Sequence, residues 1–256
     1  MKLKLWRLLG RVSSTIGISS RIQGGSNVVL MFHHVGAENQ SLSVEGFQNV
    51  LDFVEKNFEI VDIPEVFENS EERRAAITFD DGYQNVFENA YPLLKEKNLP
   101  FTVFLNSEFI TEEGTAFPEQ LKNQEKIINF NQAKELAGDE LANIQNHGKR
   151  HQDLTQLSGK EPSDEINGSK EELEKLLDIE IESFCYPYGH YDEEAVRAAS
   201  ENQGYCLTVD RGFVDPGSTE RSKIPRIDGA QEFKLLKWEL TSVAEKIFSK
   251  MDQTRY

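Results

Sequence analysis

The chain has 256 residues, with 28 Lys or Arg against 44 Asp or Glu, and its formal net charge is -16. So acidic a chain is poorly suited to tracking nucleic-acid phosphates, and we expect no nucleic-acid partner. A hydrophobic content of 38% excludes wholesale disorder, and the length favours one large domain.

The first residues, MKLKLWRLLGRVSSTIGISSR, begin with basic side chains, as a signal peptide does. Arg7, Arg11 and Arg21 interrupt every apolar run, so we expect no cleaved leader and a cytoplasmic location. At helical spacing the apolar residues share one face, and we treat residues 1–27 as a basic amphipathic segment before a domain at 28–256. This segment either packs on its own domain or makes a peripheral contact with the inner membrane.

Short apolar, β-branched runs predict about eight strands. They span residues 28–33, 58–61, 75–79, 101–105, 142–145, 182–186, 205–209 and 224–227. Helical patterns between them cover residues 44–57, 84–97, 131–136, 163–177, 192–203 and 231–248. This α/β alternation predicts parallel strands with right-handed crossovers, and so many units in this length favour a distorted (β/α) barrel. Two long irregular stretches, 106–129 and 211–223, are expected to shape a substrate groove.

The strand predicted at residues 75–79 stops at two adjacent carboxylates, Asp80 and Asp81, and Gly82 then turns the chain toward a helix. Where a strand ends, the backbone can leave the sheet, so that one acid faces a metal ion and the other faces a bound water. The alternative is an aspartate helix cap beside a solvated acid.

His147 and His151 lie four positions apart, just after the strand predicted at residues 142–145. On a helical turn both imidazoles would face one point. With one carboxylate they would form a set of metal ligands that leaves coordination positions open for water and substrate. A histidine pair of this spacing is also common on protein surfaces. The pair and the two acids nevertheless both fall at strand ends, where barrel enzymes carry their active sites.

We therefore predict that Asp81, His147 and His151 hold a divalent cation. Such an ion would lower the pKa of a bound water toward about 7 and leave Asp80 to accept the proton as the water attacks a carbonyl. This arrangement is typical of metal-assisted amide or ester hydrolysis.

These residues resemble the motifs of the polysaccharide deacetylases with a NodB-homology domain, carbohydrate esterase family four. The TFDDG motif of that family appears at 78–82, its H-[ST]-x-x-H motif at 147–151, and its R-x-P-Y-G motif, in altered form, at 185–189. The resemblance runs from about Val28 to Asp228 and implies a single-domain distorted (β/α) barrel of the NodB type.

The resemblance also implies roles for individual residues. Asp80 corresponds to the catalytic base, and Asp81, His147 and His151 correspond to the ligands of zinc, with cobalt or nickel as other candidate metals. In the altered third motif, Pro187 and Tyr188 would contact the substrate, and the backbone N–H of Tyr188 would help to hold the oxyanion.

Two positions depart from the family pattern. Cys185 stands where many members have an arginine that pairs with the catalytic aspartate, and no histidine follows His190, although many members place a general-acid histidine near the C-terminal end. We hypothesise that Arg226, at the end of another predicted strand, replaces the missing arginine by pairing with Asp80. The alternative is a surface arginine.

The resemblance is closest to the branch that deacetylates poly-N-acetylglucosamine exopolysaccharide. In that branch the motif order is circularly permuted and the acid comes from an N-terminal YH motif, which Phe32 and His33 match here. His33 ends an apolar strand, so a barrel would bring it to the same rim as Asp80, where it could protonate the leaving amine. We prefer His33 to His34 for this role, since His34 would project to the other side of the strand.

The function predicted from the sequence is removal of N-acetyl groups from N-acetylhexosamine units of a polysaccharide or its precursor, with a metal-activated water as the nucleophile. The first alternative is a catalytically inactive glycan-binding protein on the same fold, which Cys185 and the absent C-terminal histidine would suit. The second alternative is a hydrolase of small amides, because fold alone does not determine the substrate.

Overall fold

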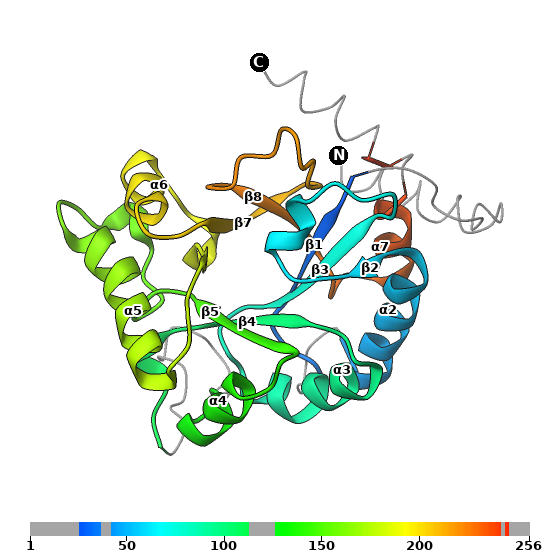
Figure 1. Ribbon diagram of the computed structural model, residues 1–256, viewed down its shortest axis with the longest axis horizontal. Coiled ribbons are helices and arrows are strands. Elements are labelled where there is room, and N and C mark those ends of the chain that lie inside the picture. The colour runs from blue at the N-terminus through cyan, green and yellow to red at the C-terminus, as the bar shows by residue number, and fades with distance from the viewer. Residues whose placement is uncertain (1–25, 37–41, 113–125, 242–243, 246–256) are drawn as a thin grey trace.

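The computed structural model describes residues 26–36, 42–112, 126–241 and 244–245 (Figure 1). The predicted amphipathic segment therefore lies outside the described residues except for Ser26 and Asn27. Among the described residues, every helix is too short or too polar for a bilayer crossing.

Eight strands form the centre of the described structure, and every pairing between them is parallel. They are β1 (Val28–Phe32), β2 (Glu59–Ile60), β3 (Arg74–Phe79), β4 (Phe101–Leu105), β5 (Ala142–Asn146), β6 (Ser183–Cys185), β7 (Tyr205–Arg211) and β8 (Ile224–Asp228). The sheet runs β1-β8-β7-β6-β5-β4-β3, and β1 also pairs with β3, which closes the ring. The short β2 pairs with the beginning of β3 on the edge that β4 occupies further along. The distorted barrel expected from the sequence is confirmed.

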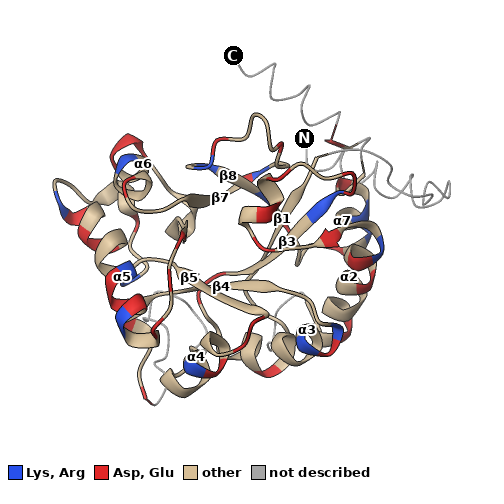
Figure 2. Ribbon diagram, in the orientation of Figure 1, with Lys and Arg blue, Asp and Glu red and all other residues tan. Residues whose placement is uncertain are grey.

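Helices surround this barrel, and most of the Lys, Arg, Asp and Glu residues on them lie toward the outside (Figures 1 and 2). The described helices are α2 (Val44–Asn57), α3 (Tyr91–Lys97), α4 (Phe130–Ala137), α5 (Glu161–Leu177), α6 (Glu193–Ser200) and α7 (Phe233–Glu239). Because all strands are parallel, their carboxyl ends meet at one rim of the barrel.

Alternating side chains along the strands separate the core outside the barrel from the core in its interior. Val28, Leu30 and Phe32 of β1 belong to the large cluster between the strands and the helices. Val29 belongs to a second cluster, which contains residues of β3, β4, β6, β7 and β8 and therefore fills the barrel interior. Cys185 is part of that interior cluster and is fully buried.

Two predicted helices differ from the observed ones. The segment expected as a helix at residues 84–97 is helical throughout, but it contains a π-helical turn, Val86–Ala90, in which the N–H of Tyr91 bonds to the carbonyl of Val86, and α3 follows from Tyr91. Pro92 explains the change, because it has no N–H to donate to the carbonyl four residues earlier.

The helix expected at residues 231–248 is interrupted, since α7 ends at Glu239. The Thr241 hydroxyl donates to the carbonyl of Trp238 and accepts from the N–H of Ala244. A threonine that accepts from the third N–H beyond it acts as an N-cap, which explains why the chain starts a new turn there.

An aromatic cluster connects α2 to the barrel. Ser43 caps α2 by accepting from the N–H of Gly46, and the buried Phe47 lies 5.3 Å from Phe32 and 5.8 Å from Phe79 between ring centroids. Burying an aromatic ring of this size contributes several kcal/mol of stability.

We predict that Phe47→Ala lowers the free energy of unfolding by about 3–5 kcal/mol, because it leaves a cavity against β1 and β3. Val44, on the same helix and 38% exposed, provides the control, and Val44→Ala should cost less than about 1 kcal/mol. Urea denaturation followed by circular dichroism measures both. Equal costs for the two variants would contradict this placement of the core.

Candidate active site

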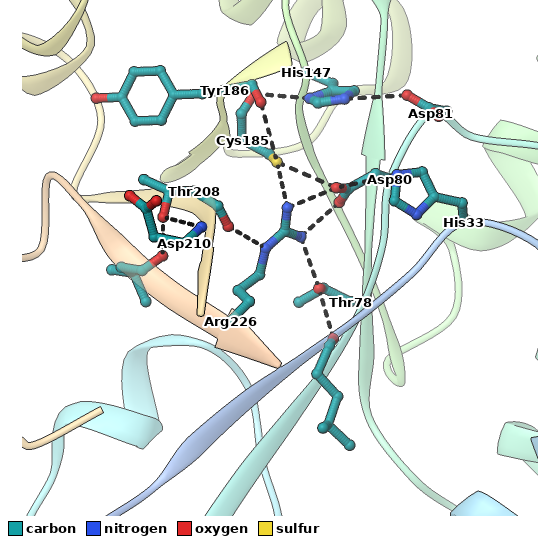
Figure 3. A network of polar contacts seen from close by, with 12 residues as sticks. His33, Thr78, Asp80, Asp81, His147, Cys185, Tyr186, Thr208, Asp210 and Arg226 are labelled. Atoms are coloured by element: carbon teal, nitrogen blue, oxygen red, sulfur yellow. Dashed lines mark hydrogen bonds and ion pairs between the residues drawn. The ribbon is translucent and has the colours of Figure 1, made fainter. Parts of the chain in front are cut away.

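The candidate functional residues come from five strands and meet at the carboxyl-end rim. Asp80 and Asp81 follow β3, His33 follows β1 and His147 follows β5. Cys185 is the last residue of β6, and Arg226 lies in β8 (Figure 3).

Asp81 faces both imidazoles of the predicted metal set. Its Oδ1 atom lies 3.2 Å from Nε2 of His147 and 3.1 Å from Nε2 of His151, and the side chains of all three residues are buried. The backbone of Asp81 has φ 72° and that of Gly82 has φ 67°, so the chain leaves the strand in a left-handed turn. Consecutive side chains that would point apart on a strand are thereby both kept at the rim.

The histidine loop is not the helical turn expected from the spacing of the two residues. No helix covers residues 147–151, and Gly148 and His151 have φ values of 82° and 54°. The imidazoles still converge, with ring centroids 4.9 Å apart. The two imidazoles therefore converge because contacts hold the loop, and not because of helical periodicity.

The donor set fits a divalent cation. Nδ1 of His147 donates to the carbonyl of Cys185 at 2.8 Å, which leaves the lone pair of Nε2 facing Oδ1 of Asp81. That Oδ1 atom is buried and accepts no hydrogen bond from the described residues. Lone pairs facing one another at such distances repel unless a positive charge lies between them, and two nitrogens with one carboxylate oxygen form a suitable set for zinc.

The pKa of Asp81 agrees with this need for a cation. Burial by itself raises the pKa, but the close imidazoles of His147 and His151 outweigh it and hold the pKa well below its ordinary value. The carboxylate is therefore ionised at neutral pH and available as a ligand.

Asp80 is paired with Arg226, the contact hypothesised from the sequence. Arg226 Nη1 and Nη2 each donate to one Asp80 oxygen at 2.7 Å, and both side chains are almost fully buried (Figure 3). Burial raises the pKa of Asp80, but the charge of Arg226 and its hydrogen bonds outweigh this effect and leave the pKa lowered. The alternative of a surface arginine is excluded.

The guanidinium has further partners that the sequence analysis did not identify. Its Nε donates to the carbonyl of Thr208 at 2.8 Å, and Nη1 donates to the Thr78 hydroxyl at 3.1 Å. Thr78 lies on β3, two residues before Asp80, and this spacing could have revealed it. The Thr208 carbonyl belongs to the backbone and carries no sequence signal.

Cys185 occupies the remaining side of Asp80. Its Sγ accepts from Arg226 Nη2 at 3.0 Å and donates to Asp80 Oδ2 at 3.5 Å. Burial raises the pKa of the thiol, so it stays protonated and serves as a donor rather than as a nucleophile. Asp80, His147 and Cys185 also lie close enough to hold an ion, but the positive charge of Arg226 already compensates Asp80 and would repel a cation there.

The two neighbouring histidines are separated as the sequence analysis expected. His33 is 42% exposed, and its Nε2 lies 4.0 Å from Asp80 Oδ2. His34 stacks on Tyr83 at 3.7 Å, and its Nδ1 lies 3.1 Å from the Asn85 amide nitrogen. Burial, followed by the charge of His33, lowers the pKa of His34 to about 4, so that His34 is neutral.

The altered third motif places an aromatic ring beside the metal set. Pro187 is buried in the short turn η5 (Pro187–Gly189), and Tyr188 has φ 59° there. The Tyr188 ring is 43% exposed and packs edge-on against His151 at 4.4 Å. Gly189 has φ 68°, and a Cβ there would collide with Val209, which explains the glycine.

Comparisons with known proteins agree with this geometry. A family model described as polysaccharide deacetylase matches residues 67–206. The chain is 29% identical over 152 residues to the Bacillus subtilis protein YxkH, a match that covers 59% of this chain and 48% of YxkH. It is 26% identical over 176 residues to a poly-beta-1,6-N-acetyl-D-glucosamine N-deacetylase of Staphylococcus aureus, a match that covers 65% of this chain and 59% of that protein. The matches thus span about half to three fifths of each of these relatives.

Solved structures support the fold. IcaB from Ammonifex degensii superposes with a TM-score of 0.70 at 21% identity, over 82% of this chain and 94% of that structure. At this identity the likeness shows the barrel architecture alone.

We predict that Arg226→Met lowers the free energy of unfolding by about 3–5 kcal/mol at pH 7, because it leaves a buried carboxylate without its partner. The parent's lowered Asp80 pKa adds stability at neutral pH, which is lost as the pH falls through the folded pKa. Without the guanidinium, burial should raise the pKa of Asp80 above its unfolded value. The difference in the free energy of unfolding between the parent and Arg226→Met should therefore shrink as the pH falls toward about 4.

Urea denaturation between pH 7 and pH 4 measures this change, with Arg197→Met as the control. Arg197 is exposed and forms a surface ion pair with Glu194, so its loss should cost less than about 1 kcal/mol at every pH. A loss of unfolding free energy in Arg226→Met that did not change with pH would contradict the ion pair.

Proposed function

Because the chain belongs to the polysaccharide deacetylase family, we propose that it hydrolyses the N-acetyl groups of N-acetylhexosamine units in a polysaccharide or its precursor. In this reaction a water oxygen bonds to the acetyl carbon and the carbon–nitrogen bond breaks. The products are acetate and a free amine on the sugar. The observation that carries the proposal is the division of the two adjacent acids, with Asp81 facing two imidazoles and Asp80 held by Arg226.

Asp81, His147 and His151 would hold a divalent metal, with zinc as the first candidate and cobalt or nickel as the others. When bound, such an ion lowers the pKa of water and polarises the acetyl carbonyl. The Nδ1 contact of His147 with Cys185 fixes the ring so that Nε2 remains available.

Asp80 is assigned the role of base, which takes the proton of the attacking water. Its pKa is lowered, so it is ionised at neutral pH and able to accept. Oδ2 accepts from Arg226 and from the Cys185 thiol, whereas Oδ1 keeps a second lone pair beyond the one that Arg226 uses, so the ion pair orients the base without saturating it.

His33 is assigned the role of general acid, which delivers a proton to the departing amine. It lies on the exposed side of Asp80 at 4.0 Å, where the leaving group of a bound sugar would emerge. Tyr188 offers its backbone N–H to the developing oxyanion, and its exposed ring beside His151 provides a surface for a sugar ring.

The protein should release acetate from N-acetylglucosamine oligomers when zinc, cobalt or nickel is supplied, and chelation should abolish the release. No acetate from any oligomer with any of these metals would contradict the proposal and favour a glycan-binding protein. Equal turnover of the monosaccharide and of the oligomers would contradict a polymeric substrate.

Asp80→Asn should retain metal and lose turnover, with kcat reduced at least about 100-fold, because the base is removed while the ligands remain. His147→Ala should lose both metal and turnover. Metal content by mass spectrometry and acetate release measure the two effects. Equal metal loss in the two variants would refute the assignment of Asp80 as base and His147 as metal ligand.

His33→Gln should reduce kcat for acetate release by about 100- to 10,000-fold, because the group that protonates the departing amine is removed. His34→Gln, the neighbouring control, should keep most of the activity. An unchanged kcat in His33→Gln would assign the proton to another group.

A further inference from the structure

One buried acid lies next to the candidate site without belonging to it. Glu165 of α5 is 1% exposed. Because a glutamate is seldom buried without a partner, its contacts indicate why it is buried there. Its Oε1 accepts from the backbone N–H of Arg150 at 2.7 Å, and its own carbonyl accepts from the N–H of Lys149 at 3.2 Å. Both contacts fall between the two histidines of the metal set.

The loop from His147 to His151 is held through consecutive backbone amides. The N–H of Gly148 bonds to Asn146 Oδ1 at 2.9 Å, and the next two amides bond to Glu165. The carbonyl of His147 accepts from Asn106 at 2.6 Å. A loop tied at this many points has little freedom to change the separation of its two imidazoles.

The loop needs such restraint because its conformation is not the one the chain would choose alone. His151 has φ 54°, a left-handed conformation that costs a residue with a side chain about 1–3 kcal/mol unless its surroundings impose it. Gly148 has φ 82°, and a Cβ on it would lie 3.3 Å from Glu165 Oε1. The loop therefore fits closely against the glutamate carboxylate.

An ordinary ion pair does not explain the burial of Glu165. The only cation in contact with it among the described residues is Arg150, whose guanidinium is half exposed and lies 3.4 Å away. The shorter bond is the one to the backbone amide, at 2.7 Å. The carboxylate is thus placed as an acceptor for the loop backbone.

We propose that Glu165 is a positioning residue for metal binding. By holding the Arg150 amide, it sets the backbone between His147 and His151, and with it the distance between the two Nε2 atoms that face Asp81. This inference rests on the metal site proposed above. Glu165 itself touches neither the metal nor the substrate.

Helix α5 offers a matched control on the same face, two turns further along. Glu172 accepts from Lys149 Nζ at 2.7 Å and from the Ser107 hydroxyl at 2.6 Å. Lys149 reaches it by crossing Gly168, where any side chain would collide with the lysine. Glu172 contacts the loop directly through the Lys149 side chain. The backbone N–H of Ser107 donates to the Gly148 carbonyl at 3.2 Å without using Glu172, so removal of Glu172 should leave the loop backbone in place.

The test measures zinc affinity by chelator competition and the visible absorption of bound Co²⁺ in the purified full chain. Glu165→Met keeps the volume and removes the acceptor, and Glu165→Asp keeps the charge and withdraws it by one methylene group. Both should weaken zinc binding by about 10- to 100-fold and change the Co²⁺ spectrum. Glu165→Gln, which retains an acceptor oxygen, should restore the parent spectrum and stay within about threefold of the parent affinity, as should Glu172→Met.

Parent affinity in Glu165→Met and Glu165→Asp would overturn the proposal, as would equal losses in Glu172→Met and Glu165→Met. If Glu165→Met does not fold, the comparison of Glu165→Asp with Glu165→Gln decides, because both keep a polar group of similar size. Failure of the parent chain to bind zinc or Co²⁺ would instead refute the metal site itself.

Discussion

Two carboxylates on consecutive residues are buried at the end of β3, and the barrel has to supply positive charge to both. The buried guanidinium of Arg226 satisfies Asp80 through two hydrogen bonds of 2.7 Å. Oδ1 of Asp81 faces two imidazoles and accepts no hydrogen bond from the described residues, which is the arrangement that a cation completes. Because Arg226 already compensates the charge of Asp80, a metal ion would bind at Asp81. The two neighbouring acids therefore have different roles, Asp80 as a base and Asp81 as a ligand.

The closed parallel barrel makes the separation possible, because it brings side chains from β1, β3, β5, β6 and β8 to one rim. The arginine that the family motif would place at residue 185 comes here from β8, and Cys185 fills the smaller space that remains. Cys185 links the two halves of the site. Its thiol contacts Asp80 and Arg226, and its backbone carbonyl orients His147. Outside the barrel, α5 holds the histidine loop through Glu165.

Much of this architecture could be predicted from the sequence, because buried parallel strands are short apolar runs whose limits polar residues mark. The predicted strands at residues 101–105 and 205–209 agree with β4 and the start of β7. The acids and histidines could be located because they follow such runs directly. The conformation of the histidine loop could not be predicted, since its left-handed residues are held by a glutamate that follows His151 in the chain by 14 positions. The π-helical turn before Tyr91 and the end of α7 likewise depend on single residues, Pro92 and Thr241, within otherwise helical patterns.

X-ray absorption spectroscopy of the zinc-loaded protein tests the central claim most directly, because it identifies the atoms around the ion. With Asp81, His147 and His151 as ligands, the first shell should contain two imidazole nitrogens and carboxylate or water oxygens at about 2.0–2.2 Å. A sulfur scatterer at about 2.3 Å would place the ion on Cys185 instead and contradict the account, as would a first shell without imidazole.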